Sequence, residues 1–253
     1  MNGLKNFIKK YWLTIIIYIG LVLLYIYCTE SGIANPYLFP SVDSIEKAFQ
    51  ASKGIMLTNM FSSFNLMIPS IILSLTFALV VGTILGLVEW LRDALYPIIY
   101  SFSVVPSILL SPFVLLLAPN FVVASVFLIV YGTVWTTLFS TITGIMTIDK
   151  RYLDKAATLE LSGFKLMTKV ILPAASPSIL SGFVSSLRST FLMLVYVEMY
   201  GTQYGMGFFV KKYSEFGLFD HTWVGFIFLV IVLVIVMQMF EKLKNFMLKW
   251  TIG

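Results

Sequence analysis

The stretch that decides the fold is residues 154–177, DKAATLELSGFKLMTKVILPAASP. It is charged and has a helical pattern, whereas long apolar runs lie on either side of it. The apolar positions Leu153, Ala156, Ala157 and Leu161 are spaced 0, 3, 4 and 8 residues apart, which places them on one face of a helix. This spacing predicts a short amphipathic helix at the start of the stretch.

The second half of the stretch predicts a bend and another helix. Gly163 permits the bend, residues 166–172 predict a second short helix, and Pro173 is expected to end it. Ser176 and Pro177 then have the residue types of a helix cap and a first helical position. The stretch is therefore either an ordinary interfacial loop or a docking element for a cytoplasmic partner.

Composition makes the rest of the chain an integral membrane protein. Of its 253 residues, 59% are hydrophobic and only 11% are charged, with a mean hydropathy of +0.94, whereas a soluble domain carries about 25% charged residues. The apolar runs are continuous rather than alternating, so we expect spanning helices and not a barrel. The predicted fold class is all-α, with about six transmembrane helices in a single unit covering residues 1–253.

Each predicted span is near the ~20 residues that cross a ~30 Å hydrocarbon core. The first follows a basic start but has no small-residue cleavage site after it, so we expect a retained helix. The third is interrupted by Pro106 and Pro112. The six predicted spans are approximately residues 11–27, 67–88, 95–117, 121–146, 177–200 and 223–246.

The distribution of Lys and Arg predicts the orientation, because these residues are enriched in cytoplasmic loops. With both termini cytoplasmic, inside segments carry twelve of them and outside segments carry four, with Arg188 left inside a helix. The twelve are Lys5, Lys9, Lys10, Arg92, Lys150, Arg151, Lys155, Lys165, Lys169, Lys242, Lys244 and Lys249; the four are Lys47, Lys53, Lys211 and Lys212.

This orientation assigns the loops to the two sides of the membrane. Residues 147–176, which contain the opening stretch, form a cytoplasmic loop. Residues 29–66 and 201–222 form extracytoplasmic loops. Within residues 29–66, Ser41 can cap a short helix whose residues Ile45, Ala48 and Phe49 share one face.

The opening stretch resembles the cytoplasmic "EAA" loop of ABC-transporter permeases of the binding-protein-dependent type. That pattern is Glu-Ala-Ala, three residues, Gly, and further on an apolar residue and Leu-Pro. Asp154 matches the Glu, Ala156 matches the second Ala, and Ser162 matches a Ser that is frequent after the Gly. Lys155 replaces the first Ala and Glu160 replaces the Gly, so the usual contact chemistry is altered at these two positions.

The flanking sequence is similar to the nitrate, sulfonate and taurine branch of these permeases. The segments that carry this similarity are VPSILLSPFVLLL at 105–117, LPAASPSILSG at 172–182, VEMYG at 197–201 and GMGFFV at 205–210. The usual Phe-Gly after the first of them is Ala118-Pro119 here. The resemblance covers residues 39–248, nearly the whole chain.

The resemblance implies a type I ABC importer permease of a bacterial or archaeal cytoplasmic membrane. It implies a second permease copy, identical or related, two ATPase subunits that bind the ATP and Mg, and an extracytoplasmic substrate-binding protein. The chain itself would hold no cofactor and no metal, catalyse nothing and have no nucleic-acid partner. The residues implied to couple to the ATPase are Leu153, Asp154, Lys155, Ala156, Ala157, Glu160, Leu161, Ser162 and Gly163.

Three residues are candidates for the translocation path. Arg188 lies mid-helix, where a charge costs about 2.5 kcal/mol or more, so it faces a substrate pathway, pairs with a partner or snorkels. Similar permeases often have Arg at the position of Val184, one turn earlier, so we expect Arg188 to lie on the same face. Trp135 either lines the path or packs in the bundle, and Glu198 either lines the path or anchors the outer loop.

The sequence has few features of other classes of membrane protein. An enzyme would need a cluster of His, Asp or Glu in the membrane, but the chain has one histidine, His221, and one cysteine, Cys28. No phosphate-binding glycine motif, filter sequence or internal repeat is evident. The expected solute is a sulfonate, taurine or nitrate; the alternatives are a thiamine precursor or riboflavin-like solute, or a membrane scaffold outside the ABC class.

Overall fold

The computed structural model describes residues 2–249, so the ends of the predicted unit 1–253 lie outside the described residues. Within the described residues, all regular structure is helical. The long elements are α1 (Asn2–Glu30), α2 (Val42–Leu87), α3 (Glu89–Ser103), α4 (Ser107–Leu117), α5 (Phe121–Met146), α8 (Leu172–Gly201) and α10 (Phe219–Met247). The short elements are α6 (Lys150–Thr158), α7 (Gly163–Leu166), a π-helical segment (Met167–Ile171) and α9 (Met206–Glu215).

All six predicted spans coincide with helices. Five helical stretches are long and apolar enough to cross a membrane, and the bent pair α3–α4 makes a sixth. The all-α membrane fold predicted from composition is therefore confirmed, while the side on which each loop lies stays a prediction.

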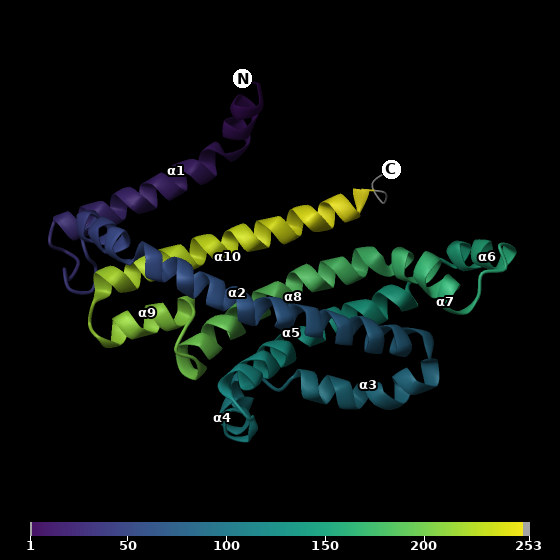
Figure 1. Ribbon diagram of the computed structural model, residues 1–253. Coiled ribbons are helices and arrows are strands. Elements are labelled where there is room, and N and C mark those ends of the chain that lie inside the picture. Colours follow the sequence, from purple (N-terminus) through teal and green to yellow (C-terminus); the bar gives the residue numbers. More distant parts are fainter. Residues whose placement is uncertain (1, 250–253) are drawn as a thin grey trace.

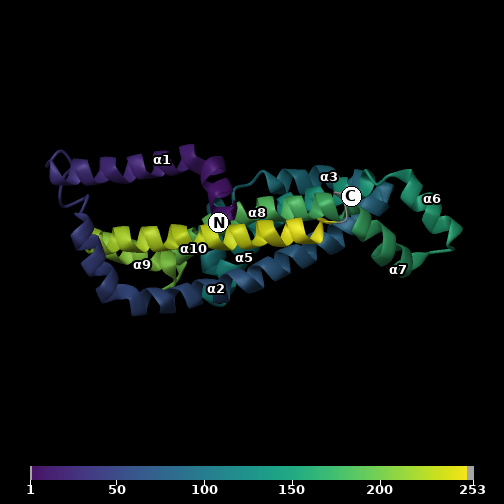
Figure 2. The same cartoon turned by 90° about the horizontal axis from the view of Figure 1, so that it is seen from above.

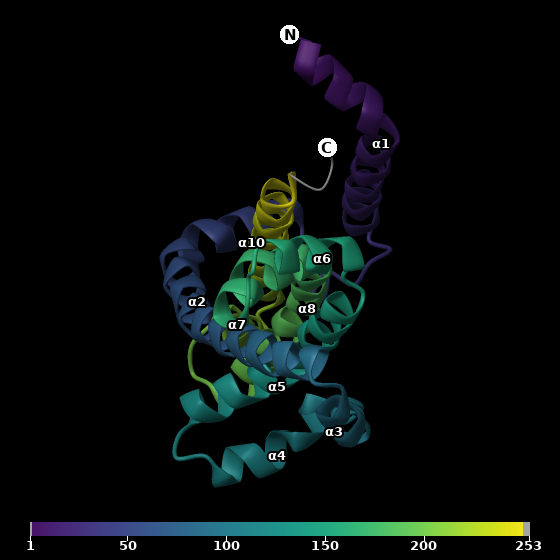
Figure 3. The ribbon, with the colours of Figure 1, turned by 90° about the vertical axis from the view of Figure 1, so that its right-hand side faces the viewer.

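The helices α2, α5, α8 and α10 form the body of the molecule (Figure 1). The short helices α6 and α7 lie at one end of this body, and α9 lies at the opposite end (Figure 2). Viewed from its end, the body has α3 and α4 on one side and α1 standing apart on another (Figure 3). The apolar stretch of α1 buries none of its residues in the chain.

Small and hydroxyl-bearing residues join α5 to α8. Thr133 and Thr190 share a hydrogen bond of 3.0 Å between their hydroxyls, and Thr137 donates to Ser186 at 3.2 Å. An added Cβ at Gly182 would collide with α5. Hydrocarbon provides no hydrophobic drive for helices to associate, so close approach through small residues and interhelical hydrogen bonds stabilises the pair.

The short helix expected near residue 41 is the beginning of α2. Ser41 does cap it, since its Oγ accepts from the Ser44 N–H at 3.3 Å. The helix then continues without a break to Leu87, so residues 29–66 are not a loop with a separate short helix. Three polar residues after position 50, Ser52, Asn59 and Ser63, lie on the buried face of this helix.

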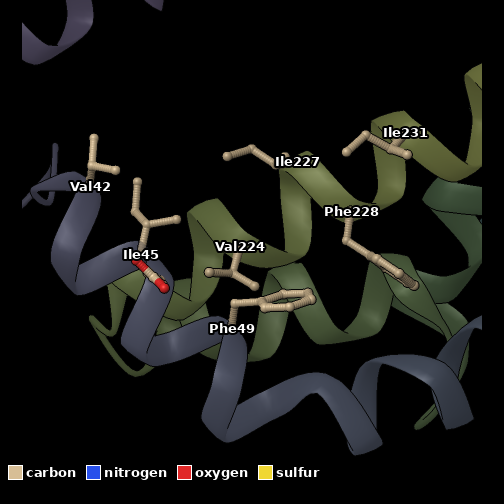
Figure 4. A pocket seen from close by; sticks show the side chains of 8 residues that line it. Val42, Ile45, Phe49, Val224, Ile227, Phe228 and Ile231 are labelled. Carbon is tan, nitrogen blue, oxygen red and sulfur yellow. The ribbon is translucent and has the colours of Figure 1, made fainter.

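The start of α2 and the start of α10 enclose an apolar groove (Figure 4). Ile45 and Phe49 line it from α2, and Val224 and Ile227 line it from α10. Ala48, the third residue of the predicted face, is buried. The predicted amphipathic face of this helix is therefore the one that packs beside α10.

Two expectations about prolines near the opening stretch are wrong. Pro173 does not end a helix, because the π-helical segment continues directly into α8 and Pro173 lies in the first turn of α8. Because the helix is continuous here, Pro173 does remove one backbone donor, and a local π-helical adjustment is one way in which a helix accommodates this loss. Ser176 and Pro177 lie inside α8 rather than at its cap. The wider π-helical turn, which residue types do not signal, is what makes this continuity possible.

The third span breaks at Pro106 but not at Pro112. The axes of α3 and α4 meet at 87°, and Pro106 is the N-cap of α4. Pro112 cannot donate to the carbonyl of Ile108, but the Ser111 hydroxyl donates to that carbonyl at 2.7 Å. A side chain thus replaces the missing backbone hydrogen bond, and α4 stays continuous.

Candidate functional site

Helix α6, at one end of the body, begins with a charged N-cap residue, Asp149. Asp149 accepts from the Arg151 N–H at 2.9 Å and from the Arg151 Nε at 2.9 Å. These bonds lower the pKa of Asp149 to about 2, the side-chain bond from Arg151 being the largest cause. Because the pKa is lowered, the cap is intact at any pH above about 4 and is lost only as the pH falls toward 2.

The same helix ends in a Schellman motif. The Leu161 N–H donates to the Ala156 carbonyl at 3.0 Å, and the Glu160 N–H donates to the Ala157 carbonyl at 3.0 Å. Glu160 has φ of 53° and is the one non-glycine residue with positive φ within residues 2–249. This left-handed position is where glycine is favoured, and it is the position at which similar permeases carry Gly.

The motif divides the predicted apolar face. Ala156 is buried, and Leu161 is partly buried beside it. Leu153 and Ala157 remain exposed, because the chain leaves the helix after Thr158 and turns Leu161 back toward the body. The prediction that all four residues share one helical face is therefore wrong at Leu161.

The most exposed apolar side chains of the segment were missed from the sequence. Leu159 is 70% exposed and Phe164 is 74% exposed, and they stand on either side of the turn at Glu160. Their exposure depends on the left-handed turn, so residue spacing alone could not have found them. The other predicted coupling residues are also exposed: Asp154, Lys155, Glu160, Ser162 and Gly163.

Replacing Glu160 with glycine is expected to stabilise the end of α6. An L-residue in the left-handed region costs about 1–2 kcal/mol, of which glycine's greater unfolded-state entropy cancels about half. Amide exchange at residues 160 and 161 should slow by a few-fold in Glu160→Gly. The matched control Glu46→Gly lies inside α2, where glycine should destabilise. Faster exchange in Glu160→Gly would contradict the assignment of the motif.

At the opposite end of the body, side chains from two helices cap the N-terminus of α9. The Gly207 N–H donates to Glu198 Oε2 of α8 at 2.7 Å. The Gly205 N–H donates to Asn59 Oδ1 at 2.8 Å, and the Met206 N–H donates to Ser63 Oγ at 2.9 Å, both from α2. Glu198 is fully buried. A carboxylate and two polar side chains here satisfy amides that the helix itself leaves free.

The geometry of Glu198 is that of a loop anchor. Its Oε2 holds the turn between α8 and α9, and its Oε1 has no hydrogen-bond partner within the described residues. The anchoring partners Asn59 and Ser63 were missed because the sequence placed them in a loop. Their spacing of four residues, which puts both on one helical face, was the available signal.

Arg188 lies on an exposed side of α8. Ser181, Ser185 and Leu192 are exposed on the same side, one turn apart. Val184 is buried, so the expectation that positions 184 and 188 share a face is wrong. Four residues advance a helix by 400°, so Arg188 is rotated by 40° from Val184. This rotation takes Arg188 out of the buried face of α8. No ion pair joins Arg188 to any other residue within residues 2–249.

Trp135 lies beside a cavity of about 230 Å³ at the break between α3 and α4. Its ring meets Tyr131 edge-on at 5.3 Å, and its Nε1 has no hydrogen-bond partner within residues 2–249. Ser189 and Leu192 of α8 also line this cavity. Since Leu192 is one turn from Arg188, the cavity and the exposed arginine lie along adjacent parts of α8. The structure therefore brings Trp135 and Arg188 to one region and places Glu198 elsewhere.

These features are those of a membrane permease, and the comparisons with known proteins agree. Residues 74–243 match the family described as binding-protein-dependent transport system inner membrane component. Because the match covers more than half of the chain, the protein belongs to this family. It is a multi-pass membrane protein of the permease type.

Two relatives carry the names of the predicted branch. The chain is 28% identical over 172 residues to the putative aliphatic sulfonates transport permease SsuC of Bacillus subtilis, covering 68% of this chain and 62% of the relative. It is 25% identical over 178 residues to the nitrate import permease NrtB of Synechococcus elongatus, covering 70% and 63%. The chain thus spans a little under two thirds of the length of these two relatives.

A solved structure has the same fold. It is described as inward-facing conformations of the MetNI methionine ABC transporter, with a TM-score of 0.65 and 14% sequence identity. The match covers 78% of this chain and 98% of the other. At this identity the likeness concerns the fold alone, which is that of a type I ABC importer permease.

Proposed function

We propose that this chain is the membrane-spanning subunit of an ATP-driven importer that receives a small anionic or zwitterionic solute from an extracytoplasmic binding protein. Two ATPase subunits bind the ATP and Mg, and a second permease, identical or related, completes the path. Both termini and residues 147–176 face the cytoplasm of a bacterial or archaeal cell. Family membership supports the transport role, and the names SsuC and NrtB favour a sulfonate, taurine or nitrate as the solute.

The observation that carries this proposal is the structure of residues 147–176, which we call the coupling segment. Helix α6 is capped at both ends and stands outside the body, and the turn after it and α7 expose the apolar side chains of Leu159 and Phe164. Exposed apolar side chains among charged ones mark a protein-interaction surface. A short rigid helix that is displaced by an ATPase can transmit this displacement to the rest of the permease, because little of it is absorbed by local flexibility.

The connection from α6 into the body provides the route for this push. The segment from Gly163 to Gly201 continues from α7 through the π-helical turn into α8 without a break. Ile171, Ala175 and Ile179 of this segment form a buried cluster with Ile145 of α5. Since α5 and α8 are joined along their length, movement of α6 tilts both helices together.

Reconstitution tests the proposed function. The chain, its genomically neighbouring ATPase and a neighbouring binding protein should together show solute-stimulated ATP hydrolysis and uptake into vesicles. The chain alone should hydrolyse no ATP. Hydrolysis by the purified chain, or failure of any ATPase to co-purify with it, would overturn the proposal.

The proposed solute charge is tested at Arg188. If an anionic solute passes this arginine, Arg188→Ala should lower its transport about tenfold while the complex still assembles. Arg188→Lys should retain part of the activity, because it keeps the charge but loses the guanidinium fork. The matched control Ser185→Ala removes a polar group from the same exposed side and should transport normally. Loss of assembly in Arg188→Ala would instead assign the charge to a structural partner.

A vitamin precursor is the second candidate solute. Trp135 and Tyr131 line the cavity at the broken span, and aromatic faces stack well on a heteroaromatic ring. Thermal-shift screening of the binding protein against nitrate, sulfonates, taurine, thiamine precursors and riboflavin separates the candidates. Stabilisation by a heteroaromatic compound alone would replace the anionic assignment.

A further inference from the structure

A groove lies between α6 and the start of α8, on the side of α6 that faces the body. Its volume is about 280 Å³. One wall comes from α6 and the turn after it, and the other comes from the π-helical segment and the first residues of α8. The lining residues that carry the argument are Tyr152, Lys155, Leu161, Lys169, Val170 and Pro173.

The charges of this groove are all of one sign. Lys155 and Lys169 line it from opposite walls, and no carboxylate is among its lining residues. Neither lysine forms an ion pair within residues 2–249. Lys155 also stands where similar permeases carry a small alanine. The substitution that weakens the resemblance therefore supplies one of the two cations of the groove.

The groove lies at the depth where the membrane hydrocarbon ends. Residues 170–187 contain no charged residue, and Lys169 immediately precedes this run, about two helical turns before the predicted span 177–200. A long lysine side chain at this position can reach the lipid headgroups at the end of that span. Residues 121–148 are likewise uncharged, and α6 begins directly after them. Both walls therefore leave the membrane at this depth.

The surface between the two lysines is apolar. Leu161, Val170 and Pro173 form it, and Tyr152 adds an aromatic ring of the kind that is common at membrane interfaces. A free phosphate ion would contact the two lysines but would gain nothing from the apolar surface between them. A phospholipid gains from both parts, because its phosphate meets the lysines and the upper part of its acyl chain lies on the apolar surface.

We propose that this groove is a binding site for the headgroup of an anionic phospholipid, with Lys155 and Lys169 sharing its phosphate. The lipid sits behind the coupling helix and ties α6 to the membrane surface. The site requires neither the transported solute nor an ATPase, so it stands apart from the proposed transport function.

Native mass spectrometry of the full chain released from micelles tests this site. The probes are phosphatidylglycerol and phosphatidylcholine with identical acyl chains. Each lysine near an anionic surface contributes about a fivefold change in affinity. We therefore expect one phosphatidylglycerol to bind about 25-fold more tightly than phosphatidylcholine, and the double variant Lys155→Gln/Lys169→Gln to lose that preference.

The control removes two positive charges from the same end of the molecule but outside the groove. The variant Lys165→Gln/Lys242→Gln changes two exposed lysines and should keep the preference. Equal losses in the two double variants would mean general attraction to anionic lipid and would overturn the site. Displacement of the lipid by millimolar inorganic phosphate would overturn it as well, because the site would then accept a free anion. Equal binding of the two lipids by the wild-type chain would also refute it.

Discussion

Replacing Gly205 with alanine is expected to destabilise the end of the molecule that contains α9. Gly205 has φ of 116°, which side chains rarely adopt. An added Cβ would lie 2.5 Å from Glu198 Oε1 and 2.7 Å from its Cγ. Glu198 cannot move aside, since it is fully buried and holds the Gly207 N–H. Backbone strain and overpacking each cost about 1–3 kcal/mol, so the free energy of unfolding should fall by about 2–6 kcal/mol.

The measurement is the midpoint of thermal unfolding in detergent. For a chain of this size the expected loss corresponds to a fall of about 10 °C in Tm. Gly54→Ala is the matched control, because Gly54 lies inside α2 with open space around its Cα. There alanine should be neutral or slightly stabilising. A Gly205→Ala protein as stable as Gly54→Ala would show that the cap on α9 is not a rigid anchor.

Replacing Ala157 with aspartate is expected to abolish docking of an ATPase on α6. Ala157 is exposed on this helix, between Leu153 and the turn that carries Leu159. A carboxylate buried without a partner at such a contact costs several kcal/mol, so docking should weaken by at least about a hundredfold. Membrane insertion should be unchanged, because α6 lies outside the spans. Co-purification of the ATPase and uptake in vesicles measure the two effects.

Asn245→Asp is the control for Ala157→Asp. Asn245 is exposed in the last turns of α10, at the same end of the body as α6 (Figures 1 and 2). The Asn245→Asp substitution adds the same charge at the same end of the molecule with almost no change in side-chain shape. It should leave ATPase docking intact. Normal transport by Ala157→Asp would show that α6 is not the coupling element, and equal losses in both variants would indicate a general charge effect.

The sequence by itself determined the membrane class and the positions of the spans. Continuous apolar runs must become helices in hydrocarbon, because each backbone amide there needs an internal partner. The span over 121–146 coincides with α5 for this reason. The amphipathic helix that became α6 and the cap at Ser41 were also predictable, since both depend on residues within one or two turns.

Tertiary structure decided the features that depend on contacts between distant residues. Asn59 and Ser63 join a continuous α2 because their polar groups meet amides of α9, about 145 residues later in the chain. Residue spacing could not place Leu161, because a left-handed residue at Glu160 turns the chain back toward the body. Arg188 is exposed because α5 packs on a different face of α8. Local patterns fix which segments are helical, whereas burial against other helices fixes which side chains remain available to a partner or solute.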